Sequence, residues 1–172
     1  PGGLVWRHTW IRGELRDYLN RPRETGETVE PETFRLFARI HHAHAEWYRK
    51  LFLSSRDPLA VCEIVSHRCL QAAKCLAAIR GLMKGSNLSE DAAPLASRAA
   101  QALQDGVKSL HLGRKAMLGS GFSRSTCRRL DHLRKVAVKA VREECQGLEK
   151  CGGEATAIAR WMESLCADIC VK

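Results

Sequence analysis

The chain has 172 residues, of which 28 are Lys or Arg and 19 are Asp or Glu, so its formal net charge is +9 at pH 7. A chain of this length can bury about two-thirds of its unfolded surface in one domain without disulfide staples. The positive charge favours anionic partners such as RNA, DNA, acidic proteins or anionic lipid. No run of about 18 consecutive apolar residues is present that would predict a transmembrane segment.

The N-terminal part of the chain is predicted to form a short helix followed by a polar arm. Apolar and aromatic residues recur at helical spacing from Leu4 to Leu19. Residues 20–30 are polar, contain proline and glycine, and show no periodicity, which is typical of a loop or tether. We therefore expect two parts, a helix and arm at residues 1–30 and a helical bundle domain at residues 31–172.

A long helix from Pro31 to Phe52 is predicted to lie at the centre of the fold. Proline suits the first turn of a helix, and at about 100° per residue the apolar side chains cover about half of the circumference. So broad an apolar surface predicts contacts on two sides, as in the middle of a bundle. His41 and His44 fall within this surface beside Tyr48, whereas His42 falls on the polar face.

Four more helices are expected, at residues 58–84, 91–117, about 124–150, and 154–171. Asp57 is the expected N-cap of the first of these, and Pro58 is its first residue. Small residues and cysteines form the contact seam of that helix. Its remaining polar strip consists of Glu63, His67, Gln71 and Lys74. The next helix has alanine and glycine on its contact side, which predicts close packing against a neighbour.

The fold class predicted from these elements is all-α, an antiparallel helical bundle of about five to six helices. The eight cysteines lie mostly on the apolar sides of the helices and not in loops. This placement predicts reduced, buried thiols and not the framework of a small secreted disulfide protein. Disulfides between helices stay open as an alternative, because an even number of cysteines permits them.

The histidines on the inner face of the first long helix are candidate metal ligands. His41 and His44 are three residues apart and share one face, and imidazole nitrogens bind zinc, iron or haem. The expected partners are Glu63 and His67 on the next helix. No complete metal-binding motif is present, and the competing interpretation is that neutral histidines fill a polar gap between helices. No cofactor is assigned.

Six basic side chains form a row on one face of the helix predicted at about 124–150. At about 100° per residue they span about 80°, with no acid between them. The row consists of Arg124, Arg128, His132, Lys135, Lys139 and Arg142. It suits a phosphate backbone but contains no aromatic residue for base stacking, so sequence-specific recognition is not expected. The alternative is a solvated face that keeps the protein soluble.

These features predict a non-catalytic structural subunit of a larger assembly, which contacts other protein subunits and meets RNA or an acidic partner through the basic row. The alternative is an enzyme or carrier in which the histidines hold a metal or haem. The expected location is inside the cell, in a mitochondrion or another organelle, because the chain is basic and begins with Pro1 and not methionine. Secretion stays open and would require disulfides.

Overall fold

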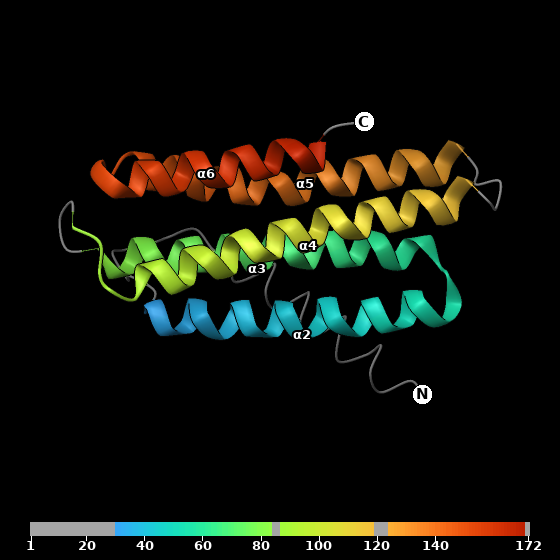
Figure 1. The fold of residues 1–172 in the computed structure, drawn as a ribbon, viewed down its shortest axis with the longest axis horizontal. Helices are drawn as coiled ribbons and strands as arrows, with labels where there is room; N and C mark the ends of the chain where they lie inside the picture. Colours follow the sequence, from blue (N-terminus) through green and yellow to red (C-terminus); the bar gives the residue numbers. More distant parts are fainter. Residues whose placement is uncertain (1–29, 84–86, 119–123, 171–172) are drawn as a thin grey trace, which may run out of the picture.

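The computed structural model describes residues 30–83, 87–118 and 124–170, which contain five helices (Figure 1). The helices are α2 (Pro31–Ser55), α3 (Pro58–Leu82), α4 (Ala92–Leu118), α5 (Arg124–Glu149) and α6 (Gly153–Cys170). The all-α class is therefore confirmed. The helix predicted at residues 4–19 lies outside the described residues. Within the described ranges, no helix has a stretch long and apolar enough to cross a membrane.

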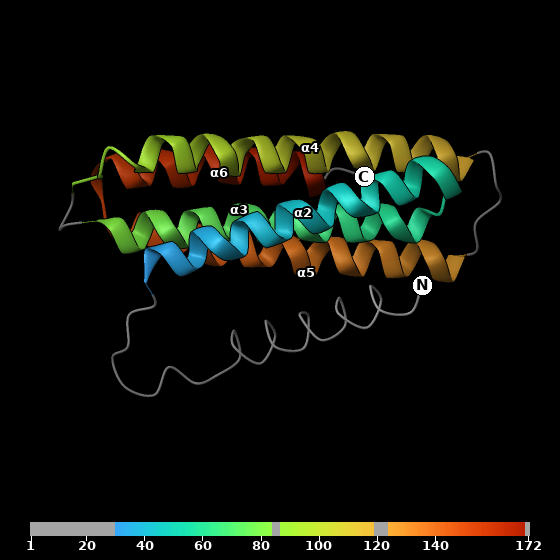
Figure 2. The same cartoon turned by 90° about the horizontal axis from the view of Figure 1, so that it is seen from below.

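Four of the helices form a bundle, and α2 packs on its outside. Helix α3 packs against α4 and α5, and α6 packs against the same two helices, so the order around the bundle is α3, α4, α6, α5. Figure 1 and Figure 2 show that the consecutive helices α3 and α4 run antiparallel, as do α5 and α6. Helices α4 and α5 are also consecutive, yet they occupy opposite corners of the bundle.

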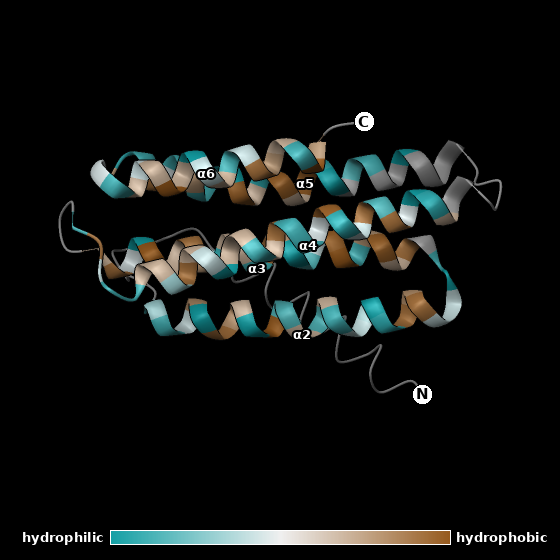
Figure 3. Ribbon diagram, viewed as in Figure 1, coloured by the Kyte–Doolittle hydropathy of each residue, from teal (hydrophilic) through white to brown (hydrophobic). Residues whose placement is uncertain are grey.

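The central helix is α3, so the prediction that Pro31–Phe52 lies at the centre is wrong. Residues 72–79 of α3 are all buried, because α2, α4 and α5 surround this helix. Among the described helices, α2 packs extensively against α3 alone. Its apolar surface is therefore covered on one side, and Leu36, Trp47 and Leu51 are 49%, 40% and 36% exposed. Figure 3 shows the resulting mixture of apolar and polar bands along α2.

Helix α3 begins as predicted, and its polar strip lies under α2. The Asp57 side chain accepts a hydrogen bond at 2.9 Å from the backbone N–H two residues on, and Pro58 is in the first turn. His67 is buried, and so is Lys74, whose ammonium lies 5.5 Å from the centre of the Phe34 ring. The interface between α2 and α3 thus contains charged and polar groups as well as apolar ones.

The close approach of α3 and α4 depends on one glycine. A Cβ atom on Gly113 would lie 2.8 Å from Cγ1 of Val61, which is too close without movement of the neighbour. A Cβ atom on Gly106 would lie 3.6 Å from Cβ of Arg68, which is an ordinary contact. Of these two interior glycines, only Gly113 is required by the packing.

Candidate functional site

The predicted basic row lies on the exposed face of α5. The opposite face packs against α3 and α6 and buries Ala137, Val138, Val141, Cys145 and Leu148. The exposed members of the row are Arg128, His132, Lys135, Lys139 and Arg142. The side chain of Arg124, the sixth predicted member, lies outside the described residues. The structure thus places five of the six predicted residues on one solvent-facing surface.

Two acids at the edges of the row form ion pairs with its lysines. Lys135 Nζ lies 2.9 Å from Asp131 Oδ2, and Lys139 Nζ lies 3.7 Å from Glu143 Oε1. The hydrogen bond from Lys135 lowers the pKa of Asp131, with further help from the Arg134 guanidinium and against the effect of desolvation. Exposed pairs of this kind contribute little stability, because solvent screens them. A polyanion can therefore replace these acids as the partner of the lysines.

The four residues predicted as a metal site do come together, between α2 and α3. The Nδ1 atoms of His41 and His67 are 3.0 Å apart, and both side chains are buried. The ring of His44 meets that of His67 edge-on, with 5.0 Å between the ring centres. Glu63 Oε2 lies 3.9 Å from His67 Nε2, and the Tyr48 ring stacks against His67 at 5.7 Å. His67 therefore contacts all the other members of this histidine cluster.

The geometry of the histidine cluster is that of a hydrogen-bonded pair. A hydrogen bond between two ring nitrogens requires one Nδ1 to donate and the other to accept, so at least one of the rings of His41 and His67 is neutral. Among the described residues, no group of three or more His, Cys, Asp or Glu side chains is arranged to hold a metal ion. The arrangement fits the interpretation of histidines that fill a polar gap, and the metal site stays a prediction.

A buried arginine beside the histidine cluster joins α2 to α3. The Arg68 side chain is 4% exposed and donates hydrogen bonds to His42 Nδ1 at 2.8 Å and to Gln71 Oε1 at 3.0 Å. It also donates to a carboxylate oxygen of Glu46. Burial acts to raise the pKa of Glu46, but the hydrogen bonds and charges of Arg49 and Arg68 lower it overall. This Arg68 network fixes α2 on α3, and sequence analysis did not identify it.

The buried cysteines are not suited to nucleophilic chemistry. The buried free thiols include Cys69, Cys75, Cys145 and Cys166. Burial raises the pKa of Cys75 to about 11 and the pKa of both Cys145 and Cys166 to about 12. A thiol that stays protonated at neutral pH is a poor nucleophile, so these side chains act as small apolar groups.

Comparisons with known proteins offer no functional guide. No protein-family model matches the chain, and no curated protein or solved structure is significantly similar to it. The function must therefore be inferred from the side chains and their geometry.

Proposed function

We propose that the chain is a non-catalytic helical subunit that binds a polyanion, either RNA or the acidic surface of another protein, through the exposed face of α5. The observation that supports this proposal is the row formed by Arg128, His132, Lys135, Lys139 and Arg142. At about 1.5 Å per residue, the row is about 21 Å long. A surface of that length can meet several phosphates or carboxylates at once.

The chemistry of the row favours contacts with backbone charges. Each cation that neutralises a phosphate releases counterions, so the affinity for RNA should fall steeply as salt increases. No Phe, Tyr or Trp side chain lies in the row for base stacking, so binding should depend little on nucleotide sequence. The ion pairs at the edges of the row are exposed and weak, and a polyanion supplies replacement charges for them.

The proposal is tested with a triple variant of α5, which carries Arg128→Gln, Lys139→Gln and Arg142→Gln. A matched control removes the same charge from other exposed positions through Lys50→Gln, Lys115→Gln and Arg160→Gln. Binding of labelled poly(U) RNA and of labelled polyglutamate is measured by fluorescence anisotropy across a salt series.

We expect the α5 variant to bind its polyanion at least about ten-fold more weakly than the control variant does. For RNA, loss of three phosphate contacts should also reduce the slope of log affinity against log salt by about 2. The polymer that binds more tightly identifies the class of partner. If the two variants bind alike, the row is a solvated face and the proposal is wrong.

The convergence of four side chains in the histidine cluster supports a second function, a metal- or haem-binding carrier or enzyme. Protein purified without chelators should then contain stoichiometric metal or absorb in the visible range. His67→Gln should abolish that signal, because His67 contacts the other three residues. Metal-free, colourless protein that gains no bound metal when zinc or haem is added would exclude this function.

A further inference from the structure

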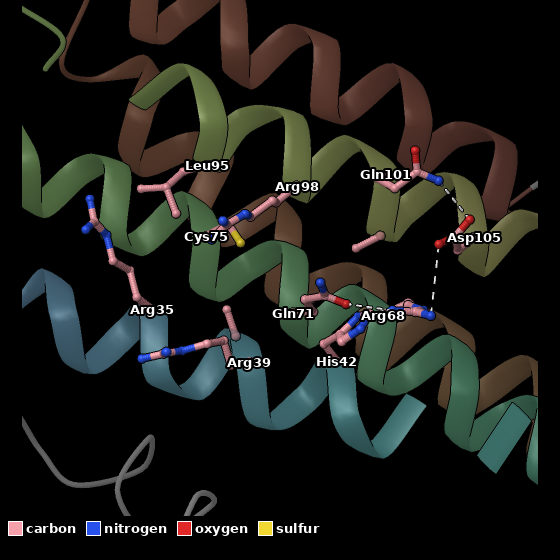
Figure 4. Close-up of a pocket in the computed structure, with 12 residues that line it drawn as sticks. Arg35, Arg39, His42, Arg68, Gln71, Cys75, Leu95, Arg98, Gln101 and Asp105 are labelled. Carbon is pink, nitrogen blue, oxygen red and sulfur yellow. Dashed lines mark hydrogen bonds and ion pairs between the residues drawn. The ribbon is translucent and has the colours of Figure 1, made fainter. Parts of the chain in front are cut away.

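A cavity of about 370 Å³ opens between α2 and α4, with α3 as its floor (Figure 4). Its volume is within the range of about 300–1,000 Å³ that is usual for small-ligand sites. Arg39 reaches the cavity from α2, and Arg98 reaches it from α4. The apolar part of the lining consists of Ala38, Cys75, Leu95 and Ala102. The cavity thus combines an apolar inner wall with positive charge at its mouth.

The two other arginines of the cavity are already engaged within the protein. Arg35 forms ion pairs of 3.2 and 3.1 Å with two carboxylates, and Arg68 is held by its network between α2 and α3. Arg39 and Arg98 are exposed, and within the described part of the chain neither has an ion-pair partner. These two guanidinium groups are therefore available to a ligand.

Asp105 is the only acid among the described residues that line the cavity, and its charge is offset. It accepts a hydrogen bond at 2.9 Å from Gln101 Nε2, and it lies 3.5 Å from Lys108 Nζ. The Arg68 guanidinium is 4.0 Å away on the other side. Asp105 therefore does not cancel the positive charge of Arg39 and Arg98.

The charge of Arg98 acts on the inner wall itself. Figure 4 shows Arg98 extending from α4 toward Cys75 on α3. Burial raises the pKa of Cys75 to about 11, and the positive charge of Arg98 opposes that rise. The guanidinium group is thus close enough to the apolar wall to meet the charged end of a molecule that lies on it.

We propose that this cavity binds an amphipathic organic anion, whose apolar body lies on the inner wall and whose carboxylate, sulfonate or phosphate pairs with Arg39 and Arg98. A guanidinium group binds such anions through two parallel hydrogen bonds, which orient the ligand. An apolar lining with a few polar groups is also the usual composition of small-molecule sites. The site is separate from the basic row, because α5 packs against α3 and α6 and does not border the cavity.

The test uses anilinonaphthalene sulfonate, a fluorescent probe that joins an aromatic body to a sulfonate. The probe is titrated into the full chain, into the double variant Arg39→Gln and Arg98→Gln, and into a control. The control, Lys115→Gln and Arg160→Gln, removes the same charge from exposed positions that do not line the cavity. Naphthalene sulfonate, naphthalene methanol and sodium sulfate are then compared as competitors. Circular dichroism verifies that each variant retains its helices.

The cavity variant should bind the probe at least about ten-fold more weakly than the control, because it lacks two charge-assisted hydrogen bonds. Only naphthalene sulfonate should displace the probe. Equal binding by the two variants would place the probe elsewhere and overturn the proposal. Displacement by naphthalene methanol would reveal an apolar site without anion selectivity, and displacement by sulfate would reveal a site for charge alone. Either result also contradicts an amphipathic ligand.

Nuclear magnetic resonance provides an independent measurement on the unsubstituted chain. The methyl groups of Ala38 and Leu95 line the inner wall, so their resonances should shift when the probe binds. Unchanged resonances at saturating probe would overturn the proposal even if the arginine variants bind more weakly.

Discussion

Two glycines of α4 allow the packing of α3 against α4 to be tested with one kind of substitution. Gly106 and Gly113 are both buried in the same helix. Alanine at either position should stabilise the helix by about 1 kcal/mol, because glycine loses more backbone freedom on folding. The two positions differ in what the added methyl group would meet. We therefore expect Gly106→Ala and Gly113→Ala to change the free energy of unfolding in opposite directions.

The size of each change in the free energy of unfolding follows from the atoms that the added methyl group would meet. At Gly106 the nearest atoms are Cβ of Arg68 at 3.6 Å and Cδ1 of Ile169 at 3.8 Å, so the gain of about 1 kcal/mol is kept. At Gly113, Cγ1 and Cγ2 of Val61 would be only 2.8 and 3.0 Å away. The branched Val61 side chain is buried and stiff, so α3 must move, and such overpacking costs about 1–3 kcal/mol. The net effect of Gly113→Ala should be a loss of about 1 kcal/mol.

Urea unfolding at 25 °C measures both effects, and a double-mutant cycle identifies their cause. Val61→Ala should destabilise the native protein through a cavity, but it should cost at least about 1 kcal/mol less in the Gly113→Ala background. The predicted clash with Val61 is refuted if Gly113→Ala is as stable as Gly106→Ala, or if Val61→Ala has the same cost in both backgrounds.

Three further predictions concern burial. Thiolate-directed maleimide should label the buried thiols at pH 8 only after the protein is unfolded in urea. The free energy of unfolding should fall as pH rises above about 9, because the thiols ionise at lower pH in the unfolded chain than in the folded one. The thiols whose pKa is raised by folding include Cys75, Cys145 and Cys166. Arg68→Met should cost about 2–3 kcal/mol in urea unfolding, because Glu46 loses a charged donor; a cost below about 0.5 kcal/mol would contradict the structural role of the network. Phe52→Ala should lower the free energy of unfolding by about 3 kcal/mol or more, because Phe52 is buried, whereas Trp47→Ala should lower it by about 1 kcal/mol or less, because Trp47 is exposed. A larger loss for Trp47→Ala than for Phe52→Ala would contradict the orientation of α2.

The helices could be predicted because their signals are local. Periodic apolar residues define each helix, and the Asp57 cap marks the start of α3. The central position of α3 could not be assigned in the same way. A broad apolar surface on Pro31–Phe52 shows how much of a helix avoids water, but it does not show how many neighbours cover it. The small side chains on all sides of α3 are the feature that permits three neighbours.

The candidate sites also differ in whether they depend on one helix or on the packing of several helices. The exposed row on α5 follows from the rotation of a single helix, so its geometry could be predicted. His41 and His67 meet because α2 and α3 are consecutive and antiparallel, which the short turn between them also predicts. The cavity requires the rotation and offset of three helices, and no pattern within one helix contains that information. Arg68 offered one signal, because it is a charged residue outside the polar strip predicted for that helix.

The net charge of the chain does not indicate which cations can bind a partner. Arg68 is held in the network that attaches α2 to α3, whereas Arg39 on α2 and Arg98 on α4 line one cavity and have no ion-pair partner among the described residues. An anion that pairs with both would link α2 to a second helix. It would therefore stabilise the one helix that the bundle supports from a single side, by an amount set by its concentration relative to its dissociation constant. A polyanion on α5 would add no such link, since α5 is already held by α3 and α6. The two proposed sites thus differ in their effect on the fold as well as in their ligands.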